Sequence, residues 1–112
     1  MKIAVTITTP DPNATFDSHF GRAGGFVVCD TDSGAQHVLA NPAAELGSGA
    51  GIRAAEFLTK QGVDVVISGS FGPKASAVLR SASLRLYLAS SGSVDDLIAR
   101  FEHGDLASVG GN

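Results

Sequence analysis

The sequence has few of the residues that would place it in several common classes of protein. It contains one cysteine and no tryptophan among 112 residues, and no run of apolar residues is longer than four. One cysteine excludes a disulfide framework and any zinc site built from several cysteines. The short apolar runs exclude a membrane-spanning helix and a signal peptide at the N-terminal end of this sequence. We therefore expect a cytoplasmic protein without a membrane partner.

Charged residues are also scarce, since Asp, Glu, Lys and Arg make up 17% of the chain. The 8 Lys and Arg against 11 Asp and Glu give a net charge of −3, which offers no electrostatic attraction for nucleic acid. The hydrophobic share of 44% is enough for a packed core. Length and composition together indicate one domain, which we place at residues 1–104, followed by a flexible tail over 105–112.

Hydrophobic periodicity predicts five strands and three helices. The strands are expected at 1–8, 26–29, 36–40, 63–68 and 84–89. The helices are expected to begin at Gly51, at Pro73 and after the N-cap Ser93. Right-handed crossovers would place the last two strands beside the first. The prediction is an α/β fold with a five-stranded mixed sheet of order 3-2-1-4-5, in which strand 2 is antiparallel to the rest.

Glycine is abundant, with fourteen in the chain, whereas an average protein has about 7% glycine. In the predicted sheet the carboxyl ends of strands 1, 3, 4 and 5 share one edge, onto which all three helix N-termini open. Free N–H groups and positive helix ends there favour an anion. Tight turns alone would use the same residues, so both explanations stay open. Nine glycines lie in the loops at this edge: Gly21, Gly24, Gly25, Gly47, Gly49, Gly51, Gly69, Gly72 and Gly92.

His19 is the candidate metal ligand, and it lies at this predicted edge. An imidazole there can ligate a metal, carry a proton or cap a turn. Arg22 would add a positive charge and Ser70 a hydroxyl donor. Cys29 lies inside the apolar run of the second strand, where we expect a buried, inert thiol. The predicted strands bring no set of carboxylates together, which argues against a two-metal nuclease.

Several segments, taken in order, resemble the dinitrogenase iron–molybdenum cofactor biosynthesis family, which includes NifX-type carriers and the C-terminal domain of NifB. The resemblance covers residues 1–104 and implies a ribonuclease H-like fold without nuclease activity. It also implies transient, non-covalent binding of a preformed iron–sulfur or molybdenum–iron–sulfur cluster, with His19 as the histidine of the family's cluster-binding motif. The segments are Ser18-His19-Phe20-Gly21-Arg22-Ala23, Asn41-Pro42, Gly49-Ala50-Gly51-Ile52, 62–69 and Gly72-Pro73.

The expected function is a non-enzymatic, monomeric carrier that receives a cluster from a donor protein and passes it to an acceptor protein. Two alternatives remain open. One is a protein-interaction module in cofactor assembly that binds no cluster, and the other is a sensor or enzyme that binds a small phosphate ligand in the same pocket. The expected cofactor-binding residues, with His19 as the metal ligand, are His19, Phe20, Gly21, Arg22, Gly49, Ala50, Gly51, Ser70 and Gly72.

Overall fold

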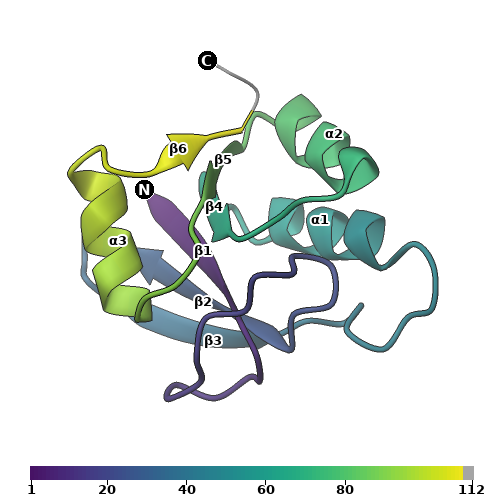
Figure 1. The fold of residues 1–112 in the computed structure, drawn as a ribbon, viewed down its shortest axis with the longest axis horizontal. Coiled ribbons are helices and arrows are strands. Elements are labelled where there is room, and N and C mark those ends of the chain that lie inside the picture. The colour runs from purple at the N-terminus through teal and green to yellow at the C-terminus, as the bar shows by residue number, and fades with distance from the viewer. Residues whose placement is uncertain (110–112) are drawn as a thin grey trace.

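A computed structural model describes residues 1–109, which form a six-stranded mixed sheet with three helices (Figure 1). The strand order is β3-β2-β1-β4-β5-β6. Strand β1 pairs in parallel with β4, as β4 does with β5, whereas β2 is antiparallel to both β1 and β3. The predicted order of the first five strands is therefore confirmed. The strands are β1 (Lys2–Ile7), β2 (Gly25–Asp30), β3 (Gln36–Ala40), β4 (Val65–Ser68), β5 (Arg85–Leu88) and β6 (Ala107–Ser108).

The prediction of five strands is wrong, because β6 lies in the segment expected to be a flexible tail. This strand pairs antiparallel with Tyr87 and Leu88 of β5, and the Val109 N–H donates to the Leu86 carbonyl at 2.8 Å. Leu106, just before β6, is buried in the core. A two-residue strand has no detectable alternation, so only the tertiary pairing defines it. Residues 110–112 of the predicted tail lie outside the described residues, and the ribonuclease H-like assignment remains a prediction.

The helices cover both faces of the sheet, in agreement with the continuous burial of side chains along β1, β2 and β4. Helices α1 (Ala50–Lys60) and α2 (Pro73–Ser81) pack on the face that carries Ala4 and Val66. Helix α3 (Val94–Glu102) packs on the opposite face, which carries Val5 and Ile67 (Figure 1). Neighbouring strand residues point to opposite faces, so both layers have an apolar surface to cover. No helix within residues 1–109 is long and apolar enough to cross a membrane.

The ends of the helices follow the expected capping chemistry at two places. The Ser93 hydroxyl accepts a hydrogen bond from the Asp96 N–H at 3.1 Å, so Ser93 is the N-cap of α3 as predicted. Gly62, just after α1, has a φ of +72°, which is the left-handed conformation that favours glycine at a helix C-terminus. Gly62 thus lies where the chain returns from α1 to β4, and Ser93 lies where α3 begins after β5. The start of α2 follows the carboxyl end of β4 in the chain.

Candidate functional site

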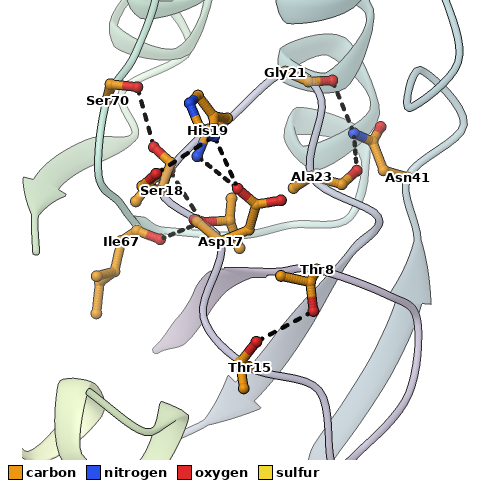
Figure 2. Close-up of polar contacts among 12 residues, drawn as sticks. Thr8, Thr15, Asp17, Ser18, His19, Gly21, Ala23, Asn41, Ile67 and Ser70 are labelled. Atoms are coloured by element: carbon orange, nitrogen blue, oxygen red, sulfur yellow. Dashed lines mark hydrogen bonds and ion pairs between the residues drawn. The ribbon is translucent and has the colours of Figure 1, made fainter. Parts of the chain in front are cut away.

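The segment 17–21 is tied to the carboxyl ends of the two central strands. The Thr6 hydroxyl on β1 donates to the Asp17 carbonyl at 2.6 Å, and the Asp17 N–H donates back to the Thr6 carbonyl at 2.9 Å. Ser70, after β4, donates from its hydroxyl to the Ser18 carbonyl at 3.0 Å, and the backbones of His19 and Ser70 form an isolated parallel bridge (Figure 2). The backbone at His19 is therefore held from two sides.

The imidazole of His19 is exposed, with 75% of its side-chain surface accessible. Its Nδ1 lies 3.2 Å from Asp17 Oδ1 and 3.4 Å from the Ser18 hydroxyl (Figure 2). No hydrogen bond within residues 1–109 involves its other ring nitrogen, Nε2. Nε2 of His19 therefore has no protein partner among the described residues, and its role as a metal ligand stays a prediction.

Protein ligands for a bare metal ion are missing from the described part of the chain. No group of three or more His, Cys, Asp or Glu side chains lies close enough together in residues 1–109 to hold one. Cys29 is buried on the α3 face, as predicted, and burial raises the pKa of its thiol. The chain's single thiol is thus neutral at ordinary pH and remote from His19 in the fold.

A surface cavity of about 340 Å³ lies where α1 and α2 begin. The N-caps of these helices are Gly49 and Gly72, and neither helix has a side-chain cap or an acidic residue in its first turn. Helix α3, on the other face, has both a serine cap and two aspartates. The residues that line the cavity are Gly49, Gly51, Ile52, Gly72, Pro73, Lys74 and Ala75.

Backbone N–H groups in the first turn of an α-helix have no partner inside the helix, and the helix dipole adds a positive field there. Within residues 1–109 the N–H groups of Gly51, Ile52, Lys74 and Ala75 make no hydrogen bond to a protein acceptor. Lys74 adds a formal positive charge at the same cavity. The cavity therefore has mostly apolar exposed walls and a positive field from the starts of two of the three helices predicted to open onto this edge.

The His19 segment and the start of α1 lie in direct contact. A Cβ built on Gly21 would stand 2.8 Å from the Cα and N atoms of Gly51, so the two backbones touch. Gly51 is also close to α2, because a Cβ there would lie 3.2 Å from the Cβ of Ala75. These approaches leave no room for side chains, and they join three segments distant in sequence into one surface.

Most of the predicted site residues gather here, and three of them have roles other than those expected. Gly49, Gly51 and Gly72 line the cavity, Ala50 begins α1, and Gly21 contacts Gly51. Ser70 does not line the cavity, because its hydroxyl holds the Ser18 carbonyl. The other two residues are Phe20 and Arg22.

Phe20 and Arg22 stabilise the loops around the site. The Phe20 side chain is 2% exposed, and its ring centroid lies 5.3 Å from that of Phe71, so it anchors the loop in the core. Large aromatic side chains are commonly buried, whereas the sequence predicted a cofactor-binding role for Phe20. The Arg22 guanidinium donates to the carbonyls of Leu46 and Gly47 at 3.1 and 2.8 Å. Its charge therefore holds the loop before α1 and does not line the cavity.

Sequence reasoning missed the roles of three residues of this region, Lys74, Asp17 and Asn41, although Asn41 lies in one of the segments that carry the family resemblance. A lysine directly after the proline that opens a helix is unfavourable for the helix dipole, and that was an available signal. Asp17 lies two residues before His19, a spacing at which an aspartate oxygen commonly accepts a backbone N–H. Asn41 gives no such signal, since its buried amide donates to the Gly21 and Ala23 carbonyls only because the fold brings them together.

Comparison with known proteins identifies a family model and a relative that each match most of this chain. The family model described as dinitrogenase iron-molybdenum cofactor matches residues 1–104. An uncharacterized protein of Methanocaldococcus jannaschii is 30% identical over 109 residues, which are 95% of this chain and 89% of that protein.

Two solved structures with the same fold extend this result. The apo form of the orange protein from Desulfovibrio gigas is 37% identical with a TM-score of 0.91, over 98% of this chain and 93% of that one. An NMR structure of a Thermotoga protein, described as a candidate NifB protein of the DUF35 family, is 28% identical with a TM-score of 0.83, over 96% and 92% of the two chains.

Proposed function

Because this chain belongs to the dinitrogenase iron–molybdenum cofactor family, we infer that it is a carrier for a metal–sulfur cluster. It holds a preformed, anionic iron–sulfur or molybdenum–iron–sulfur cluster and passes it from a donor protein to an acceptor protein. The observation that carries this proposal is the uncapped starts of α1 and α2, which meet at one cavity with Lys74 beside them. The exposed imidazole of His19, on the segment that contacts α1, would supply the metal ligand.

A cluster suits this donor set better than a bare metal ion does. A single imidazole cannot complete the coordination of an ion such as zinc, which takes four ligands. A preformed cluster brings its own sulfide ligands and needs only one open position filled by the protein. The negative charge of the cluster would meet the free N–H groups and the Lys74 ammonium.

The same donor set makes the binding reversible. Iron–sulfur proteins that retain their cluster hold it with several cysteine thiolates, whereas the single thiol of this chain is buried in the core. One imidazole and a few backbone N–H groups bind more weakly, so the cluster can be handed to an acceptor. The relative from Desulfovibrio gigas was solved in an apo form, and a fold that stays intact without its ligand is what a carrier requires.

We expect no catalysis at this site. This expectation rests on the family to which the chain belongs, whose description is a cofactor and not a reaction. Holding and releasing the cluster is the whole function that we propose.

The test is anaerobic gel filtration of the protein with isolated iron–molybdenum cofactor or a synthetic [4Fe–4S] cluster. We expect the visible absorbance to elute with the wild-type protein and with His37→Ala, and to be lost with His19→Ala. His37 is an exposed histidine on β3 and is the matched control. Failure of both clusters to elute with the wild-type protein would contradict the carrier function. Protection from thermal unfolding by inorganic phosphate, in that case, would favour a phosphate-binding sensor or enzyme.

A further inference from the structure

Asp17 is a rigid neighbour of His19. Two hydrogen bonds connect its backbone to Thr6, which is fully buried in β1: the Thr6 hydroxyl donates to the Asp17 carbonyl, and the Asp17 N–H donates to the Thr6 carbonyl. Thr6 is in turn bonded to the Ser68 hydroxyl of β4 at 3.0 Å. The Asp17 side chain is only 18% exposed. The backbone of Asp17 is therefore fixed relative to the two central strands, and its side chain is mostly covered.

The imidazole of His19, in contrast, has few contacts that could fix it. Both hydrogen-bonding contacts of its ring within residues 1–109 are at Nδ1, with Asp17 Oδ1 at 3.2 Å and the Ser18 hydroxyl at 3.4 Å. The shorter contact is with a carboxylate oxygen, which accepts a hydrogen bond from a ring N–H. This contact favours the tautomer in which the proton of the neutral imidazole is at Nδ1 and Nε2 carries the lone pair.

One oxygen of Asp17 holds both the backbone and the ring of His19. Oδ1 also accepts from the His19 backbone N–H at 2.9 Å, so two donors of the same residue converge on one acceptor (Figure 2). This arrangement restricts rotation of the side chain about the Cα–Cβ bond as well as the position of the proton. Histidines that bind metals commonly donate their second ring N–H to a carboxylate, which orients the ring and raises its basicity as a ligand.

We propose that Asp17 is a positioning residue that holds His19 in the Nδ1–H form and directs Nε2 toward the incoming cluster. This inference deepens the carrier function proposed above and rests on it for the identity of the ligand. The position of the proton on His19 does not rest on it, because that position is a property of the ligand-free protein.

If Asp17 had only a structural role, that role would be to form the turn in which its Oδ1 accepts a hydrogen bond from the His19 N–H. The same turn occurs nearby without a histidine, since Asp11 Oδ1 accepts from the Asn13 N–H at 2.8 Å. Asparagine forms such turns as well as aspartate does. Asp17→Asn therefore keeps the turn and weakens only the charged contact with the ring, and Asp11→Asn is the matched control.

The first experiment is nitrogen-15 NMR of the histidine rings in the ligand-free protein, at a pH where imidazoles are neutral. We expect the Nδ1–H form to dominate at His19 in the wild type and in Asp11→Asn. In Asp17→Asn the Nε2–H form should become populated, because a neutral amide oxygen accepts less strongly and the amide NH₂ can donate to Nδ1. His37 and His103, whose rings make no hydrogen bond in residues 1–109, are the references within each spectrum. A dominant Nε2–H form in the wild type would overturn the proposal.

The second experiment measures cluster binding by the same variants. Loss of such a carboxylate partner weakens metal binding by about 10- to 100-fold, and we expect this loss in Asp17→Asn with an unchanged melting temperature. If the ring proton of His19 has moved to Nε2 in Asp17→Asn and the affinity for the cluster is unchanged, the proposal is also overturned. If wild-type protein binds neither cluster, the carrier function fails, and the NMR result still decides whether Asp17 holds the ring.

Discussion

The backbones of Gly21 and Gly51 lie against each other. A Cβ on Gly21 would stand only 2.8 Å from the Cα and N atoms of Gly51, which is too close for a side chain. Gly21 follows the His19 segment, and Gly51 belongs to the first turn of α1. This contact places the segment that carries His19 against the start of α1, which is one of the two helix starts that line the cavity. The position of this segment relative to α1 thus depends on two glycines.

The first prediction concerns Gly21→Ala. The added methyl group collides with backbone atoms, which cannot move away as a side chain can, so we expect a loss of about 1–3 kcal/mol in the free energy of unfolding. Cluster binding should fall together with stability, because the His19 segment must move off α1. Urea unfolding and gel filtration with cluster measure the two effects. The control is Gly47→Ala, since a Cβ at Gly47 meets nothing within 4 Å; if both variants behave alike, the contact is unimportant.

The second prediction concerns the missing cap of α2. Gly72 has an extended backbone and open space around its Cβ position, so Gly72→Asp is sterically allowed. The carboxylate would cap the first-turn N–H groups and should raise stability by about 0.3–1 kcal/mol. It should also abolish cluster binding, because it occupies the same donors and repels an anion. Thermal unfolding should therefore improve while binding is lost.

A matched variant for this test is Gly47→Asp, which adds the same charge at an open position outside the cavity lining. It should change neither stability nor binding by much. Normal cluster binding by Gly72→Asp would show that the cavity between α1 and α2 is not the site.

The third prediction concerns Lys74. Its charge lies at the positive end of α2, so Lys74→Gln should leave stability unchanged or raise it slightly, by about 0.3–1 kcal/mol at most. Cluster binding should weaken and become less sensitive to salt. Lys60→Gln, which removes a charge from the last turn of α1, is the control and should bind normally. Equal losses of affinity in both variants would indicate a general effect of net charge.

The fourth prediction concerns the buried thiol of Cys29. Burial raises its pKa above the ordinary value of 9.0, so the thiol ionises more readily in the unfolded chain than in the fold. Its contribution to stability is then complete below that ordinary value and is lost as the pH rises through the pKa of the folded state. Urea midpoints measured from neutral to alkaline pH should fall more steeply for wild type than for Cys29→Ala.

Cys29→Ser tests the same residue against the cluster. A hydroxyl among apolar neighbours should cost about 1–3 kcal/mol of stability, with cluster affinity unchanged. A folded variant without cluster binding would make Cys29 a ligand, contrary to its burial on the α3 face.

The secondary structure and the order of the central strands followed from local patterns in the sequence. Alternation at Ile3, Val5 and Ile7 predicts a strand, and the spacing of Leu97, Ile98 and Phe101 predicts a helix. Ser93 is recognisable as an N-cap from its neighbours alone. Strand order then follows from the handedness of crossover connections. The strand β6 escaped prediction, because two residues cannot show a period.

For the site, the sequence by itself determined the residue types: a histidine in a glycine-rich loop, and helices that start with glycine instead of a capping side chain. Only the tertiary structure decided their arrangement. It buried Phe20, directed Arg22 to the carbonyls of Leu46 and Gly47, and placed Lys74 at the cavity. The physical reason is that hydrogen-bond partners and close backbone contacts form between segments distant in the chain, and no local pattern records which segments will meet.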